Sequence, residues 1–299
     1  MTTAYGGNPG PVRSSRRHGT LLDMHQETPG SGTEAPQQQT TGWASHHTIA
    51  DLQAVHLVHW LRAALTDARA YPFISLFYGA CFWMMALLLG WLFQSSPEYV
   101  MSLASGCLLV GPFLAMGLYD VSRRRMRGQV ARLRDSLLCW RFQLRSMGLL
   151  ALVFLVLELL WGRASLVVFA VFFNTGLPST TGVVQAVFNP DNWEFIVAYV
   201  LVGGVFAAVV FATAVVSIPM ILDHDADAIT AAIASMEVVV RNPGVMAAWG
   251  LLISGTIALA LALPWGSGLL VLGPLLGHAS WHAYCSAVQW PDDAAAIVV

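Results

Sequence analysis

The sequence predicts an all-α membrane protein in which six helices span the bilayer as one polytopic bundle. Of its 299 residues, 56% are hydrophobic and only 11% are charged, whereas soluble domains carry about 25% charged residues. Several uncharged apolar runs reach about 20 residues, the length of a helix that crosses a ~30 Å hydrocarbon core. The charges are also sorted, since all fifteen basic residues are Arg and eight of them fall between Arg123 and Arg145. These observations exclude a soluble enzyme, a collagen-like chain and a secreted disulfide scaffold.

The N-terminal region, residues 1–47, is predicted to be a disordered cytoplasmic tail. It is rich in Gly, Pro, Ser, Thr and Gln, and it has too few apolar residues to offset the entropy lost on ordering. A helical pattern then starts at Thr48, with Thr48 and Asp51 as a capping pair, and Pro72 ends it. An amphipathic helix in the membrane interface is predicted from its apolar stripe. The members of this stripe are Ala54, Leu57, Val58, Leu61, Leu65 and Ala68.

The membrane domain is predicted to cover residues 48–290, followed by a short cytoplasmic tail at residues 291–299. Its six predicted spans lie near residues 73–93, 99–119, 147–173, 195–222, 245–263 and 268–284. The arginine-rich loop between the second and third spans faces the cytoplasm by the positive-inside rule, which places both termini inside. The third span is long, so we expect it either to tilt or to break at residues 161–163.

The order of the predicted elements shows an internal repeat. Arg69-Ala-Tyr-Pro72 ends the first amphipathic helix before a hairpin that contains Leu109-Val-Gly-Pro112. Arg241-Asn-Pro243 ends a second interfacial amphipathic helix, residues 225–241, before a hairpin that contains Val271-Leu-Gly-Pro274. Both units start on the cytoplasmic side, which predicts parallel rather than inverted hairpin repeats.

Four segments carry a family resemblance. They are VGPFLAMGLYDVSRR (residues 110–124), SIPMILDHDADAITA (217–231), RNPGVMAAW (241–249) and GPLLGHASWHAY (273–284). Together they resemble the bacterial integral membrane family catalogued as domain of unknown function 2189, over roughly residues 50 to 290. The resemblance implies a multi-span inner-membrane protein without an established activity, and some members carry a cytochrome c oxidase subunit I label. Cys285 stands where the resemblance leads us to expect a basic residue.

The last predicted span ends in two histidines and two aromatic residues. His278 and His282 are four residues apart, so they lie on one face of the helix, beside Trp281 and Tyr284. We interpret the group as interfacial hydrogen bonding within an aromatic belt, with a haem or metal site as the alternative. A bis-histidine haem needs a ligand on a facing helix, and the sequence offers no histidine opposite His278. We therefore expect no cofactor, and the chain cannot supply the ligands of an oxidase catalytic subunit.

An acidic cluster follows the fourth predicted span. Asp223, His224, Asp225 and Asp227 lie within five residues and offer the hard oxygen ligands that suit a divalent cation. Aspartates at a helix N-terminus also cap free N–H groups and complement the helix dipole. We favour capping, and ion binding is the alternative.

Glu158 is predicted to lie near the middle of the bilayer, eleven residues or ~16 Å after Met147. Intramembrane carboxylates are costly and usually face a partner or a cavity. Arg163 is the nearest opposite charge, but five residues correspond to about 140° around a helix, which is poor geometry for a pair. We therefore weigh structural bonding to another helix, a proton-relay or transport role, and displacement toward the interface by a helix break.

The basic residues and the small residues point to lipid and protein contacts. Arg123, Arg124, Arg125 and Arg127 are candidates to bind anionic lipid headgroups, or they only determine the topology. Gly273 and Gly277 have the spacing of close helix contacts, which suit packing within the bundle or a contact with a homo-oligomer or another membrane protein. We expect no nucleic-acid partner beside a membrane span.

Function is less well determined than architecture. No hydrolase, metalloprotease, NTPase or dinucleotide motif occurs in the sequence. We therefore favour a non-catalytic inner-membrane protein, structural or accessory to a complex such as a respiratory oxidase. The alternative is a small-solute or proton-coupled transporter or channel that uses Glu158, and an enzyme or haem protein is the least favoured class.

Overall fold

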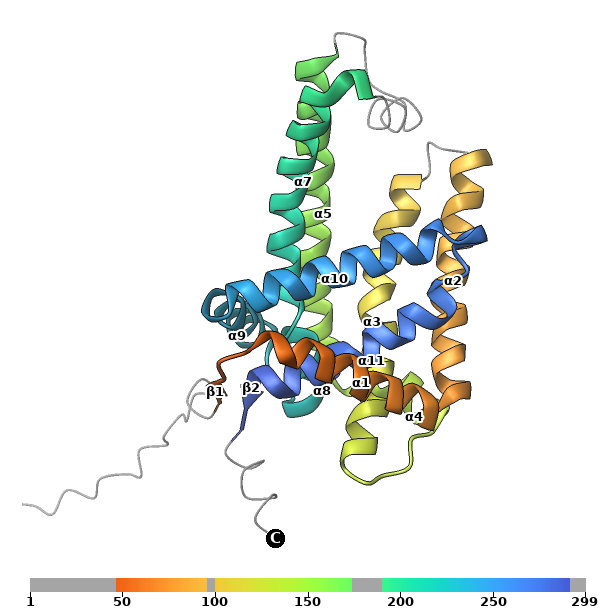
Figure 1. Ribbon diagram of the computed structural model, residues 1–299, viewed down its shortest axis with the longest axis vertical. Coiled ribbons are helices and arrows are strands. Elements are labelled where there is room, and N and C mark those ends of the chain that lie inside the picture. Colours follow the sequence, from red (N-terminus) through yellow and green to blue (C-terminus); the bar gives the residue numbers. More distant parts are fainter. Residues whose placement is uncertain (1–46, 96–99, 174–189, 291–299) are drawn as a thin grey trace, which may run out of the picture. The chain divides into compact units, whose positions relative to one another are not determined.

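The computed structural model describes residues 47–95, 100–173 and 190–290, and most of these residues are helical (Figure 1). The elements, in chain order, are β1 (Thr48–Ile49), α1 (Ala54–Ala70), α2 (Pro72–Ser95), α3 (Val100–Met126), α4 (Leu133–Leu138), η3 (Cys139–Phe142), α5 (Leu144–Phe172), η4 (Pro190–Asn192), α7 (Trp193–Ala214), α8 (Ser217–His224), α9 (Ala228–Arg241), α10 (Pro243–Ala262), η5 (Pro264–Gly266), α11 (Leu269–Ala287) and β2 (Val288–Gln289). The predicted all-α class is confirmed, and the two strands add only a short ladder.

Four helical stretches of the described residues are long and apolar enough to cross a membrane. They are Pro72–Leu92, Leu144–Phe172, Trp193–His224 and Pro243–Ala262, which coincide with the first, third, fourth and fifth predicted spans. The second and sixth predicted spans fold as helices α3 and α11, but neither is among the four. In α11, His278 and His282 lower the mean hydropathy of the helix.

The first helix begins later than the sequence predicts. Thr48 and Ile49 are extended and pair antiparallel with Gln289 and Val288, so Thr48 cannot cap a helix. The helix starts at Ala54 instead, where the backbone N–H of Gln53 donates to His56 Nδ1 at 2.9 Å. The prediction of a helix from Thr48 is therefore wrong by six residues, because pairing with a strand far along the chain holds Thr48 and Ile49 extended.

The buried face of α1 also differs from the predicted apolar stripe. Trp60, Ala64 and Asp67 are the buried residues of this helix, whereas Val58 and Leu65 of the stripe are exposed. The buried positions have the spacing i, i+4 and i+7 of one helix face. Because Asp67 is charged, a search for apolar residues alone does not identify this face.

The fourth predicted span is two helices. Helix α7 ends at Ala214 and α8 starts at Ser217, and the backbone N–H of Val216 between them donates to Ser235 Oγ at 3.1 Å. Pro219 lies in the first turn of α8, where a missing N–H costs no helical hydrogen bond. By contrast, α5 is continuous through residues 161–163, so the predicted alternative of a break there is wrong.

Helix α11 packs against α1, α2 and α3 and brings distant parts of the chain together. Glycines allow the closest approaches: a Cβ at Gly79 of α2 would lie 2.0 Å from the carbonyl oxygen of Leu270. Gly273 and Gly277 of α11 face Phe82 of α2 and Leu118 of α3. The predicted small-residue contact at Gly273 and Gly277 is thus made within this chain.

Helices α5 and α7 form a hairpin and lie side by side (Figure 1). Phe169 and Phe195 form a small core at its far end, separate from the main core, and Phe173 and Tyr199 pack against it. Many of the hairpin's Leu and Val side chains are exposed, as expected of helices that face lipid.

Candidate functional site

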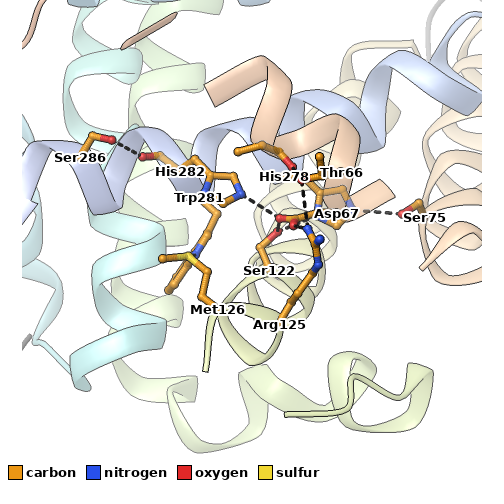
Figure 2. A network of polar contacts seen from close by, with 11 residues as sticks. Thr66, Asp67, Ser75, Ser122, Arg125, Met126, His278, Trp281, His282 and Ser286 are labelled. Atoms are coloured by element: carbon orange, nitrogen blue, oxygen red, sulfur yellow. Dashed lines mark hydrogen bonds and ion pairs between the residues drawn. The ribbon is translucent and has the colours of Figure 1, made fainter. Parts of the chain in front are cut away.

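The candidate site is a buried polar cluster around Asp67, near the C-terminal end of α1 (Figure 2). The Asp67 side chain is only 2% exposed and accepts hydrogen bonds from three donors on α3 and α11. Ser122 Oγ donates to Oδ2 at 2.6 Å, and His282 Nε2 lies 2.8 Å from the same oxygen. The guanidinium of Arg125 donates to Oδ1. A charge this deeply buried is tolerated only when it is paired and hydrogen-bonded, which these contacts achieve.

His278 extends the cluster toward α2. Its Nδ1 lies 2.8 Å from Ser122 Oγ, and its Nε2 lies 3.0 Å from Ser75 Oγ. Ser122 has one hydroxyl proton and gives it to the carboxylate of Asp67, so the Nδ1–H of His278 must donate to Ser122. A ring that carries its proton on Nδ1 leaves Nε2 to accept from Ser75 Oγ. The hydrogen bonds thus run in one direction from Ser75 to Asp67.

Opposing effects determine the ionisation of Asp67. Burial by itself raises the pKa of the carboxyl group, but hydrogen bonds from His282, Ser122 and Arg125 outweigh burial and lower the pKa below its usual value. The carboxylate is therefore ionised at neutral pH. Its negative charge is balanced locally by Arg125.

A second layer of side chains holds these groups in place (Figure 2). Trp281 of α11 is buried, and its Nε1 donates to Met126 Sδ at 3.2 Å. Ser286 Oγ donates to the carbonyl oxygen of His282 at 2.9 Å and accepts from Trp60 Nε1 at 2.9 Å. The indoles of α1 and α11 therefore fix the part of α11 that carries both histidines.

The four arginines predicted to contact anionic lipids also form ion pairs within the chain, and Arg127 is 51% exposed. Arg123, Arg124 and Arg125 lie in the last turn of α3, not in a loop. Each of the four pairs with a carboxylate: Arg123 and Arg124 with Asp120 at 2.7 Å each, Arg125 with Asp67, and Arg127 with Asp223 at 2.7 Å. Asp120 is fully buried, so these contacts contribute to the fold.

The structure divides the acidic cluster, and Asp223 belongs to its first part. Besides its pair with Arg127, Asp223 accepts from Tyr284 Oη at 3.3 Å and lies 3.3 Å from His224 Nε2. The His224 ring stacks on Trp290, with ring centroids 3.7 Å apart. Tyr284 is buried, so the end of α11 is fixed against α8.

Asp225 and Asp227 form the second part. Asp225 ends α8 in a left-handed conformation (φ 52°), and Asp227 caps α9 by accepting from the N–H groups of Ile229 and Thr230 at 3.1 and 3.0 Å. Among the described residues, no group of three or more His, Cys, Asp or Glu side chains could hold a metal ion. Asp227 thus makes the capping contacts expected at this position.

Glu158 and Arg163 lie in α5, away from the Asp67 cluster. Glu158 is partly buried and Arg163 is exposed, and no ion pair joins them. Within the part of the chain that the structure describes, no hydrogen bond to the Glu158 carboxyl is present.

Sequence reasoning found His278 and His282 but missed Asp67, Ser75 and Ser122. Their spacing carries no motif, because the contacts join residues 55 to 215 positions apart. One signal was available, namely that Asp67 continues the helix face of Trp60 and Ala64.

The fold and the site define a helical membrane protein with a buried ionic cluster. Residues 99–223 match the family model described as predicted integral membrane protein, domain of unknown function 2189. This match confirms the family resemblance that the sequence motifs indicated, and the chain is an integral membrane protein of unknown function. No curated protein and no solved structure matches the chain. The matched segment includes Ser122 and Arg125, whereas Asp67, His278 and His282 lie outside it.

Proposed function

We propose that this protein is a non-catalytic component of the bacterial inner membrane, structural or accessory to another membrane complex such as a respiratory oxidase. One observation carries the proposal: the polar groups of the Asp67 cluster bond to one another. Four cavities that the described residues line, of about 300 to 540 Å³, are formed by other side chains. A site that is filled by its own hydrogen bonds leaves no room for a substrate, and a clamp between helices is the role that it suits.

The membrane arrangement that we propose has six spans, with α3 and α11 in addition to the four apolar helices, and both termini in the cytoplasm. The arginines at the end of α3 support this orientation, since positive charge stays on the cytoplasmic side. The order of α1–α2–α3 and α9–α10–α11 fits the parallel hairpin repeats and the two interfacial helices of the sequence analysis. Insertion of a reporter after residue 128 and after residue 182 tests the orientation, and we expect the first site inside and the second outside.

Isolation from native membranes tests the accessory role. Gentle solubilisation should recover the protein together with other membrane subunits in a fixed ratio. The chain purified by itself should contain no haem. Recovery of the protein by itself would contradict an accessory role. A Soret absorbance of the isolated chain would contradict the expectation that it carries no cofactor.

A second candidate function is proton-coupled transport. The directed hydrogen bonds from Ser75 through His278 and Ser122 to Asp67 favour it, since such chains move protons in membrane proteins. Glu158, a carboxyl group in an apolar helix, is its other support. Proteoliposomes loaded with a pH-sensitive dye separate the candidates: the structural role predicts no flux above that of empty liposomes. Flux that His278→Gln or Glu158→Gln abolishes, while Glu237→Gln preserves it, would replace our proposal with transport.

A further inference from the structure

A cavity of about 400 Å³ lies where α5 begins and α8 ends. It is lined by Phe142, Gln143, Arg145, Ser146, Asp225 and Asp227. The apolar stretch Leu144–Phe172 starts at this cavity, and the apolar stretch Trp193–His224 ends beside it. The two stretches form a hairpin, so these two ends lie on the same side of the membrane. The cavity is therefore at the level where apolar helices leave the hydrocarbon core and meet the lipid headgroups.

Charges of both signs line the cavity. Arg145 contributes a guanidinium, and Asp225 and Asp227 contribute carboxylates. Among the described residues, no ion pair within 4.0 Å joins Arg145 to either aspartate. Hydrogen bonds from Thr230 and Ile229 lower the pKa of Asp227, so this carboxylate stays charged at neutral pH. The cavity thus offers separate places for a cation and for an anion.

Two further side chains indicate what the cavity accommodates. The side-chain oxygen Oε1 of Gln143 is buried and has no hydrogen-bond partner within the described part of the chain. Leaving such an acceptor unpaired costs about 1–3 kcal/mol, which a bound donor would recover. Phe142 is 87% exposed at the start of a membrane helix, where an aromatic ring suits the boundary between headgroups and acyl chains.

We propose that this cavity binds the phosphoethanolamine headgroup of a phospholipid. The primary ammonium donates to the carboxylates of Asp225 and Asp227 and to Gln143 Oε1, and the phosphate binds the guanidinium of Arg145. A divalent cation fits less well because Arg145 repels it, and a purely anionic headgroup would meet two carboxylates. A choline headgroup has no N–H to donate. This inference goes beyond the proposed function and does not depend on the role of the Asp67 cluster.

Lipid retention by the full-length protein tests the proposal. The delipidated protein is equilibrated in mixed micelles with equal amounts of phosphatidylethanolamine, phosphatidylcholine and phosphatidylglycerol of the same acyl chains, and retained lipids are counted by native mass spectrometry. We expect preferential retention of one phosphatidylethanolamine, by about tenfold over each competitor, the factor that one charged hydrogen bond supplies. Equal retention of the three lipids, or preference for phosphatidylglycerol, would overturn the proposal.

Matched variants separate the two halves of the headgroup. Asp225→Asn keeps a side chain that tolerates the left-handed conformation, and it should abolish the preference over phosphatidylcholine while phospholipid is still retained. Arg145→Gln should reduce retention of phosphatidylethanolamine about tenfold. Arg141→Gln removes a neighbouring arginine that does not line the cavity and should change nothing. A loss with Arg141→Gln equal to that with Arg145→Gln would indicate nonspecific attraction and overturn the site.

Two soluble probes distinguish other occupants. Free phosphoethanolamine should not displace the retained lipid, because it lacks the acyl chains that anchor the headgroup beside Phe142. Displacement at comparable concentration would assign the cavity to a soluble molecule and overturn the lipid assignment. Magnesium should leave retention unchanged, and competition by magnesium that Asp225→Asn removes would assign the cavity to a cation instead. Neither result bears on whether the protein is accessory to another complex.

Discussion

Two regions of this protein treat a carboxyl group in opposite ways. In the cluster between α1, α2, α3 and α11, Asp67 is almost fully buried, and donors on two other helices surround it. In the hairpin of α5 and α7, Glu158 is only partly buried, and no hydrogen bond to its carboxyl group is present among the described residues. The hairpin is instead held by aromatic contacts, such as Trp161 with Tyr199 at 5.2 Å between ring centroids.

The difference shows that Asp67 stabilises the helix cluster through its hydrogen bonds and that Glu158 does not stabilise the hairpin in this way. Asp67 joins helices that are far apart in the sequence, and removing it would leave the buried hydroxyl of Ser122 without its acceptor. Glu158 joins nothing in the described structure, and the hairpin around it depends on packing of apolar and aromatic side chains. The comparison therefore predicts large effects of substitution in the cluster and small effects in the hairpin.

Asp67→Ala should have the largest effect on stability. It removes the acceptor of the buried Ser122 hydroxyl and the carboxylate partner of His282 and of the partly exposed Arg125, and leaving such buried polar groups unpaired costs about 1–3 kcal/mol. The free energy of unfolding can be measured by titration with SDS in mixed micelles. Glu237→Ala, which removes an exposed ion pair with Arg241, is the control and should cost at most about 1 kcal/mol. Equal effects of the two substitutions would remove the distinction between the cluster and a surface pair.

Acid should destabilise the cluster through Asp67. Burial opposes ionisation, but hydrogen bonds from His282 and Ser122 lower the pKa of this carboxyl group below its usual value. At pH values between the lowered and the usual pKa, the unfolded chain therefore binds a proton that the folded chain does not, and stability falls with decreasing pH by at most about 1.4 kcal/mol per pH unit from this group. The measurement is unfolding between pH 7 and pH 3, and Asp67→Asn should flatten the profile in this range. An unchanged slope would show that other groups cause it.

Gly79→Ala should destabilise the protein more than a glycine substitution in the hairpin. A Cβ at Gly79 would lie 2.0 Å from the backbone oxygen of Leu270, so α2 and α11 would have to move apart, at a cost of about 1–3 kcal/mol. Gly203→Ala in the hairpin meets only the ring of Trp161, at 3.0 Å, and should cost less. Gly90→Ala, on the same helix as Gly79, has no atom within 4 Å and serves as the control. The same measurement of unfolding applies, and a larger loss for Gly203→Ala would reverse the order of the two contacts.

Glu158→Gln should have the smallest effect. The substitution keeps the size of the side chain and breaks no hydrogen bond of the described structure, so we expect a change within about 0.5 kcal/mol. Unfolding in mixed micelles measures it beside the isosteric substitution Asp67→Asn, which should be far more damaging. A loss at Glu158 comparable to that at Asp67 would mean that the hairpin also depends on a buried polar contact.

The sequence by itself determined the helical class, the positions of the first, third, fourth and fifth predicted spans to within a few residues, and the sorting of arginines toward one end of α3. These features follow from local composition and hydrophobic periodicity, and both can be read from short stretches of the sequence. The segments of family resemblance were also readable directly, and the family match over residues 99–223 includes the first of them and the start of the second.

Only the tertiary structure decided which polar residues act together. Asp67 carries no motif in the sequence, and Arg125 was predicted only as a candidate for anionic lipids, whereas the fold places Asp67 against both Arg125 and His282. The extended conformation of Thr48 likewise depends on a partner at Gln289. Such pairs depend on the packing of helices and strands from distant parts of the chain. The sequence shows an aspartate at residue 67 but does not show whether its carboxylate meets water or a guanidinium.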